Sequence, residues 1–243
     1  MRAVLLDAMG TLVHLQPPWP LLARGLLVDH GLKVSELEAE HALRAEMAFY
    51  RSHHDEGSDR ERLDALRRSC AEVLRRALPP QAAQHLSAAT LLPTLLGALR
   101  FEAFADAAPA LRTLREAGLR LIVASNWDVS LHEVLEHVGL RSLVDEVLTS
   151  AEAGASKPHR PIFAGALRLA GADGGQALHV GDSLECDVLG ARRAGIAAVL
   201  VRRGAPAGAA RAEVCAGVPV IGSLGDLGEL CAGRGPSPKR DRT

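Results

Sequence analysis

The side chains best suited to chemistry in this sequence stand just after short apolar segments. Asp7 follows the first of these segments, and Ser125 and Asn126 follow the second. Lys157 lies in the loop after the third, and Asp182 follows the fourth. If the segments are parallel strands of one sheet, their carboxyl ends share an edge, which is where open parallel sheets bind ligands. That edge would bring together two carboxylates, a hydroxyl, an amide and an ammonium group.

Each of these residues also has a purely structural interpretation. Asp7 could form a turn, and Lys157 could be a surface loop residue. Ser125 and Asp182 could cap the helices that follow them. The functional interpretation is favoured because all of them fall at the same predicted sheet edge. Two of the residue types are also scarce, since Asn126 is the only asparagine in the chain and lysine is nearly absent.

The elements that position these residues alternate between strands and helices. The predicted strands are short apolar segments: Arg2 to Asp7, Leu119 to Ala124, Glu146 to Thr149, Ala177 to Val180, Ile196 to Val201 and Pro219 to Ile221. The predicted helices each end at a glycine suited to a left-handed cap: Ala108 to Ala117, Val129 to Val138, Pro161 to Ala170 and Leu184 to Ala194. This alternation predicts an α/β, Rossmann-like fold, in which helices cover both faces of a parallel sheet.

Residues 17–100 interrupt the alternation with helical patterns alone. The predicted helices there are Trp19 to His30, Ser35 to His54, Ser58 to Leu78 and Gln81 to Arg100. We therefore predict an all-helical cap domain over residues 16–103, inserted into an α/β core domain formed by residues 1–15 and 104–232. The tail of residues 233–243 is rich in Gly, Pro, Ser and Arg and is predicted to be disordered.

The overall composition excludes several classes of protein. Hydrophobic residues make up 48% and charged residues 23% of the chain, which is typical of a globular protein. The net charge is -1 and aromatic residues reach only 3%, so neither a basic field nor base-stacking side chains favour nucleic acid. No apolar run reaches the roughly 18 residues that cross a bilayer, and the chain opens on a strand pattern instead of a signal peptide. We expect a cytoplasmic protein without nucleic-acid or membrane partners, and the cysteines lack zinc-site spacing.

Four short motifs, in this order along the chain, resemble those of the haloacid dehalogenase superfamily. They are Asp7-Ala8-Met9-Gly10-Thr11-Leu12, Ser125-Asn126, Lys157-Pro158, and Gly181-Asp182-Ser183 followed by Asp187. The helical insertion between the first and second motifs resembles the C1-type cap of that superfamily. The resemblance implies a Mg²⁺-dependent hydrolase that acts on a small phosphorylated molecule.

The resemblance also implies a role for each motif residue. Asp7 would be the nucleophile and form a covalent aspartyl intermediate, while Ser125 and Lys157 would bind the transferring phosphoryl group. Thr11 and Asn126 would contribute to substrate binding. Mg²⁺ prefers oxygen ligands in proteins. The implied metal ligands are Asp7, Met9 through its backbone carbonyl, Asp182 and Asp187.

Met9 departs from the pattern of most phosphatases in this superfamily, which have a second aspartate at this position. That aspartate protonates the leaving group and then activates water, whereas a thioether neither gives nor accepts a proton at neutral pH. Losing such a group typically costs on the order of 10² to 10⁴ in rate. A histidine could supply the missing proton, and the candidates are His14, His53, His54 and His159.

Three alternatives to a phosphatase remain open at this point. The chain could bind a phosphorylated ligand or a protein without catalysis. It could be a 2-haloacid dehalogenase, but those enzymes have a tyrosine in the first motif and lack the acids found here at Asp182 and Asp187. It could be a phosphonate hydrolase, for which Lys33 is the only lysine in the predicted cap that could form a Schiff base.

Overall fold

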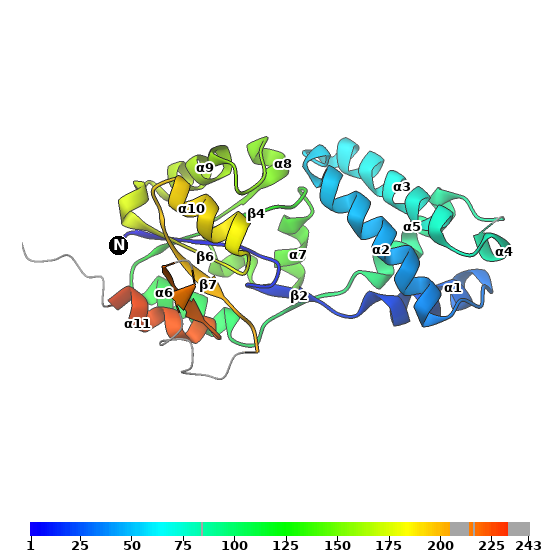
Figure 1. Ribbon diagram of the computed structural model, residues 1–243, viewed down its shortest axis with the longest axis horizontal. Helices are drawn as coiled ribbons and strands as arrows, with labels where there is room; N and C mark the ends of the chain where they lie inside the picture. Colours follow the sequence, from blue (N-terminus) through cyan, green and yellow to red (C-terminus); the bar gives the residue numbers. More distant parts are fainter. Residues whose placement is uncertain (84, 205–213, 216, 233–243) are drawn as a thin grey trace, which may run out of the picture.

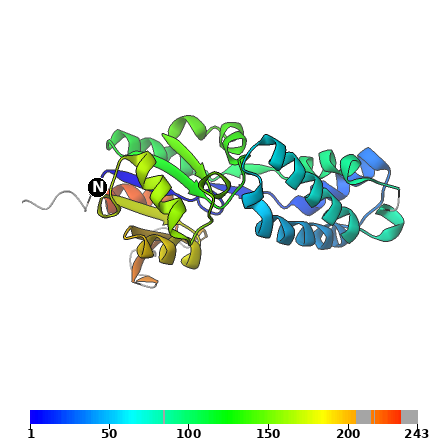
Figure 2. The same cartoon turned by 90° about the horizontal axis from the view of Figure 1, so that it is seen from above.

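The computed structural model describes residues 1–83, 85–204, 214–215 and 217–232 (Figure 1). The predicted disordered tail, residues 233–243, lies outside the described residues. Two parts lie side by side, one built on a sheet and the other made of helices, and the view from above shows the same arrangement (Figure 2). Within the described ranges, every helix is either too short or too polar to cross a lipid bilayer.

A seven-stranded sheet forms the centre of the first part. Its parallel strands are β1 (Ala3–Leu6), β4 (Arg120–Ser125), β5 (Glu146–Thr149), β6 (Ala177–Gly181), β7 (Ala197–Val201) and β9 (Val218–Ile221). The short β8 (Val214–Cys215) pairs antiparallel with β9 at one edge. The strand order is β5-β4-β1-β6-β7-β9-β8, so β1 lies between β4 and β6. Each strand predicted from the sequence is present.

The burial of β1 on both faces explains why its sequence is apolar throughout. Val4 and Leu6 pack into the core on one face of the sheet, and Ala3 and Leu5 pack into the core on the other. The first face is covered by α6 (Ala107–Glu116), α7 (Leu131–His137) and α11 (Leu227–Ala232). The second face is covered by α9 (Arg160–Ala170) and α10 (Gly190–Arg193). The α/β, Rossmann-like fold predicted from the sequence is confirmed.

The helix that follows β6 differs from its prediction. Residues 184–194 were expected to form one helix, but Leu184–Leu189 is a π-helical turn and only the short α10 continues it. The wider turn is held at its start by Ser183, whose hydroxyl accepts from Cys186 N at 3.1 Å. Turns of this kind are frequent at functional sites. Tighter 3₁₀ turns are found elsewhere at His54–Glu56, Arg141–Leu143, Gly174–Gln176 and Leu224–Asp226.

The second part is a helical cap with an apolar core of its own. Its helices are α1 (Pro18–His30), α2 (Glu36–His53), α3 (Arg60–Ala77), α4 (Pro80–Ala83) and α5 (Ala88–Ala98). The single helix expected over residues 81–100 is wrong, because α4 stops early and α5 begins separately. Ser87 starts α5 by accepting a hydrogen bond from Thr90 N through its hydroxyl. The exact domain boundaries given above stay a prediction.

Two short strands carry the chain into and out of the cap. Strands β2 (Val13–Leu15) and β3 (Phe101–Ala103) pair antiparallel and form a two-stranded sheet of their own. We call this pair the connecting ribbon. Phe104 N extends it by donating to Leu12 O at 3.0 Å. The ribbon was not predicted, because segments of this length are too short to show the two-residue alternation of a strand.

Candidate active site

The predicted site residues meet at the carboxyl-terminal edge of the sheet. Asp7 directly follows β1, Ser125 is the last residue of β4, and Asp182 directly follows β6. Because β4 and β6 pair with β1 on either side, their final residues flank the end of β1. Lys157 reaches the same edge from the loop between α8 (Ser150–Ala153) and α9. The expected convergence of these side chains is therefore found in the structure.

The Asp7 carboxylate is held through one of its two oxygen atoms. Ser125 Oγ donates to Asp7 Oδ1 at 2.9 Å, and Lys157 Nζ donates to the same atom at 2.6 Å. Within the described part of the chain no hydrogen bond reaches Oδ2, which leaves that oxygen for a ligand. Asp7 is 6% exposed. Burial raises the pKa of Asp7 to about 6, an effect that the Lys157 charge opposes and the Asp187 charge adds to.

Lys157 is buried between two carboxylates. Its Nζ lies 2.6 Å from Asp7 Oδ1 and 2.6 Å from Asp187 Oδ1. Burial alone would lower the pKa of Lys157, but the charges of the two acids hold it above its ordinary value. Asn126 fixes the Lys157 backbone, because its Nδ2 donates to Lys157 O at 2.9 Å and its Oδ1 accepts from Lys157 N at 2.7 Å. The Asn126 amide thus positions the lysine, and its expected role in substrate binding stays a prediction.

Asp187 makes a contact that was not expected from the sequence. His179, a fully buried residue of β6, lies with Nε2 2.9 Å from Asp187 Oδ1, and Ser183 N donates to Asp187 Oδ2 at 3.0 Å. Burial of Asp187 opposes ionisation, but Lys157 and His179 together hold its pKa well below the usual range. The sequence did indicate that His179 is unusual, because it is a histidine inside an otherwise apolar strand. It did not indicate that His179 contacts Asp187.

The three acids of the site could hold a metal ion. Oxygen atoms of Asp7, Asp182 and Asp187 all lie within 4.8 Å of one another. Partial burial and the charge of Asp187 raise the pKa of Asp182, so the cluster resists full ionisation by itself. Lys157 supplies a single positive charge against these carboxylates. A divalent cation would balance the remainder, and a set of hard oxygen donors fits Mg²⁺.

The loop after Asp7 places the remaining motif residues. Met9 is 36% exposed and faces the cleft between sheet and cap, so the position of the usual second aspartate is open to a ligand. Thr11 is buried, and within the described residues its hydroxyl has no hydrogen-bond partner. Its carbonyl accepts from Arg203 Nη2. No contact of Thr11 supports the expected role in substrate binding, which stays a prediction.

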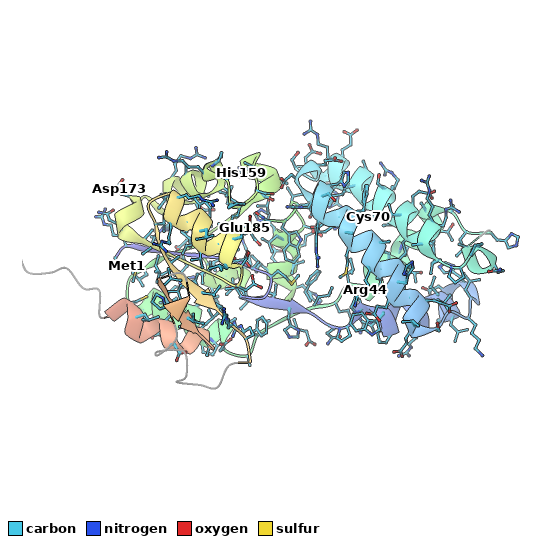
Figure 3. The ribbon with its side chains drawn as sticks, viewed as in Figure 1. Met1, Arg44, Cys70, His159, Asp173 and Glu185 are labelled. Atoms are coloured by element: carbon cyan, nitrogen blue, oxygen red, sulfur yellow. The ribbon has the colours of Figure 1, made fainter. Side chains whose placement is uncertain are left out.

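A cleft of about 1380 Å³ separates the sheet edge from the cap. Met9 and Asn126 line it on the sheet side. The cap reaches across beside the cleft, where Tyr50 OH donates to Asp128 Oδ2 at 2.9 Å. Figure 3 shows the side chains of both parts, with Cys70 and Arg44 in the cap and Glu185 just after β6. The cleft is large enough for a metabolite-sized ligand to lie between the two parts.

The histidines considered as proton donors lie in different surroundings. His54 Nε2 lies 3.2 Å from Ser156 Oγ, next in sequence to Lys157. His53 stacks on Phe49 within the cap, and His14 lies on β2 of the connecting ribbon. His159 is exposed at the start of α9 (Figure 3). Within the described residues, none of the four forms a hydrogen bond or an ion pair with a motif side chain. Lys33, considered for a Schiff base, is exposed in the turn between α1 and α2.

Comparison with known protein families gives one match over most of the chain. The model of a family described as haloacid dehalogenase-like hydrolase matches residues 1–195. A curated relative from Bos taurus, named haloacid dehalogenase-like hydrolase domain-containing protein 3, is 47% identical over 91 residues, covering 37% of this chain and 36% of the relative. A glyceraldehyde 3-phosphate phosphatase from Methanopyrus kandleri is 40% identical over 102 residues, covering 42% and 44% respectively. The matched segment thus spans less than half of each relative.

Solved structures resemble this chain over nearly its whole length. A magnesium-bound structure titled as the putative HAD-hydrolase YfnB from Bacillus subtilis superimposes with a TM-score of 0.69 at 18% identity, covering 95% of this chain and 98% of that one. A 2-haloacid dehalogenase from Pseudomonas syringae gives a TM-score of 0.67 at 23% identity, covering 97% and 100%. At such low identity these likenesses establish the shared fold and leave the reaction open.

Proposed function

The chain belongs to the haloacid dehalogenase-like hydrolase family, and from this premise we propose that it hydrolyses a small phosphorylated molecule with the help of Mg²⁺. The observation that supports the proposal most directly is the hydrogen bonding of the Asp7 carboxylate. Ser125 and Lys157 both bind Oδ1, which leaves Oδ2 at the sheet edge for attack on phosphorus. A carboxylate fixed through one oxygen and free at the other is prepared for nucleophilic catalysis.

In the proposed reaction, Asp7 Oδ2 forms a bond to phosphorus while the bond from phosphorus to the ester oxygen breaks. The leaving oxygen keeps the electron pair of the broken bond and takes a proton from water, because Met9 cannot supply one. Water then attacks the aspartyl phosphate, which releases inorganic phosphate and restores Asp7. Lys157 and Ser125 remain hydrogen-bonded around the reacting carboxylate and stabilise negative charge on the phosphoryl oxygens.

The proposed metal site consists of Asp7, Asp182, Asp187 and the backbone carbonyl of Met9. Bound there, Mg²⁺ would neutralise negative charge on the phosphoryl group and so favour attack by another anion. The chain's own contribution is to hold the acids in place. Lys157, His179 and Ser183 N all bind the Asp187 carboxylate, so the orientation of that acid is fixed before a metal arrives.

Gly10 provides a direct test of the metal site. It has φ +73°, and a Cβ at this position would lie 2.0 Å from Asp182 Oδ2. Gly10→Ala should therefore displace Asp182 and weaken Mg²⁺ binding by about 10- to 100-fold. The measurement is the rise in melting temperature on adding Mg²⁺. Gly118→Ala is the matched control, because Gly118 has φ +75° but an open space around its Cβ. Equal Mg²⁺ responses in the two variants would contradict the site.

The names of the relatives support a phosphate ester as substrate. One is named glyceraldehyde 3-phosphate phosphatase and another, from Halopiger xanaduensis, ribulose-1,5-bisphosphate 5-phosphatase. The proposal is tested by following hydrolysis of p-nitrophenyl phosphate with and without Mg²⁺, alongside chloride release from a 2-haloacid. Mg²⁺-dependent hydrolysis supports it. Chloride release in EDTA would instead indicate a dehalogenase. Mg²⁺-linked phosphate binding without turnover would instead indicate a noncatalytic binding protein.

Met9→Asp should raise the rate of hydrolysis. The exposed thioether of Met9 stands where most phosphatases of the family have a proton-transferring aspartate, and restoring that group is expected to increase kcat by about 10²-fold. Met9→Asn is the control, because its amide matches the aspartate in size but transfers no proton at neutral pH. The comparison uses an alkyl phosphate, whose poor leaving group depends most on protonation. If both variants hydrolyse it at the wild-type rate, the missing acid is not what limits turnover.

A further inference from the structure

One acidic residue of the cap is buried where its neighbours are apolar. Glu46 lies on α2 and is 4% exposed. The other buried residues of that helix are Ala39, Ala42 and Leu43. A carboxyl group placed inside an apolar layer lowers stability unless its oxygen atoms find strong hydrogen-bond donors. The position of Glu46 is therefore costly for the fold of the cap.

The partner that the cap offers to Glu46 is weak. Its carboxyl group interacts electrostatically with the thiol of Cys70, which lies on α3 and is buried as well. A thiol is a poor donor, and a carboxylate can accept about four hydrogen bonds. Burial raises the pKa of Glu46, and the interaction with the thiol opposes this rise only in part. The carboxyl group keeps unused accepting capacity.

Glu46 and Cys70 line the cleft beside the proposed active site. On the sheet side, Met9 and Asn126 of the motifs are among the residues that line the same cleft. Apolar side chains make up much of the cap wall around Glu46, namely Met47, Leu66, Leu95, Leu96 and Leu99, and the polar side chains of Tyr50, Arg51 and Arg67 line it as well. A pocket with an apolar wall and a few placed polar groups is the usual form of a small-molecule site, in which the polar group decides orientation and selectivity.

We propose that Glu46 selects the substrate by accepting a hydrogen bond from a hydroxyl group on the organic part of a phosphate monoester. This inference rests on the proposed function, because the phosphate would occupy the sheet edge and direct the rest of the molecule towards the cap. The apolar wall suits a carbon chain between phosphate and hydroxyl. On the cap side an ammonium group is disfavoured, because Arg51 on α2 and Arg67 on α3 line the cleft and would repel it, while the acids Asp128 and Glu133 line the opposite side.

The test compares esters that differ in one terminal group. The probes are n-alkyl phosphates, ω-hydroxyalkyl phosphates and ω-aminoalkyl phosphates, in a short series of matched chain lengths, and the measured quantity is kcat/KM. The wild type should prefer one or more hydroxyalkyl esters over the matched alkyl esters by about 10-fold or more, since a buried acceptor left unpaired penalises the apolar ester. The aminoalkyl esters should show no such preference.

Variants of Glu46 show whether this carboxyl group is responsible. Glu46→Leu should reduce the preference for the hydroxyl to about 1, whereas Glu46→Gln, which keeps an acceptor oxygen, should retain part of it. The ratio is measured within each variant, so a change in stability does not alter it. Glu40→Leu is the matched control, because Glu40 lies on the same helix and pairs with Arg44 at the surface. It should leave the preference unchanged.

The outcomes separate this inference from the proposed function. If the wild type hydrolyses the esters without favouring the hydroxyl group, or favours the ammonium group, the role of Glu46 is overturned. The proposed phosphatase activity is unaffected by that result. An unchanged preference in Glu46→Leu has the same two consequences. If no ester is hydrolysed, the proposed function fails. The role of Glu46 is then tested by calorimetry, as the ratio of the binding affinities of the hydroxyalkyl and the matched alkyl esters.

Discussion

Replacing Asp7 by Asn should abolish hydrolysis of phosphate esters and, in the absence of metal, make the protein more stable. The loss of activity is expected because the amide cannot form the aspartyl phosphate, and we expect a drop of at least about 10³-fold. The gain in stability is expected because the carboxylate is buried beside Asp187 and Asp182, which raises its pKa from 3.8 to about 6. Asn is close in shape to the neutral acid and does not bear this charge.

The stability gain has a defined pH dependence. The folded protein holds the Asp7 proton more tightly than the unfolded chain, so the stability of the wild type falls as the pH rises from 3.8 towards 6. The advantage of Asp7→Asn should therefore be small at low pH and level off above pH 6 at about 3 kcal/mol, the value of a two-unit shift. Urea unfolding in EDTA over this range measures it.

A control and a contrary result complete this experiment. Asp64→Asn, on α3 of the cap, changes the same chemical group outside the cluster of Asp7, Asp182 and Asp187 and should alter neither rate nor stability appreciably. Residual Mg²⁺-dependent hydrolysis in purified Asp7→Asn, at more than a hundredth of the wild-type rate, would contradict the assignment of Asp7 as nucleophile. A variant that is less stable than the wild type at pH 8 in EDTA would contradict the account of its burial.

Replacing Lys157 by Met should both stop turnover and strongly destabilise the fold. Lys157 Nζ lies 2.6 Å from carboxylate oxygens of both Asp7 and Asp187, and all three side chains are buried. Removing the ammonium leaves two facing buried carboxylates without a counter-charge. Breaking a buried ion pair in this way typically costs about 3 to 5 kcal/mol. Urea unfolding in EDTA at neutral pH measures the loss.

A second substitution shows whether unpaired charge causes the loss of stability in Lys157→Met. Adding Asp7→Asn to Lys157→Met removes one of the two unpaired carboxylates and should restore a substantial part of the stability. Lys33→Met is the control, because Lys33 is an exposed lysine in the cap and its loss should change little. If the double variant is as unstable as Lys157→Met, the destabilisation comes from packing and not from the charges.

Much of the sheet part could be predicted because several local signals agreed. The apolar run of β1 has residues buried on both faces, and the glycines after the predicted helices have left-handed φ angles, as at Gly118 and Gly171. The convergence of Asp7, Ser125 and Lys157 followed from the rule that parallel strands present their carboxyl ends at one edge. What these residues do in catalysis stays a prediction.

Other features depend on contacts between distant segments and left no local signal. His179 pairs with Asp187 across the turn after β6, and Glu46 is buried on α2, which packs against α1 and α3. In the sequence, Glu46 is one acid among several on a helix whose other acids are exposed or paired at the surface. The connecting ribbon and the break between α4 and α5 were missed because each involves only a few residues.

The connecting ribbon has a mechanical consequence for the proposed reaction. Its first strand, β2, begins six residues after Asp7, and Gly10 N donates to Val13 O at 2.8 Å, so the loop of the nucleophile and the ribbon form one hydrogen-bonded unit. A rotation of the cap that bent the backbone at the ribbon would also shift this loop. Widening the cleft in that way would move the attacking oxygen of Asp7, so we expect its alignment to be best when the cap lies close to the sheet.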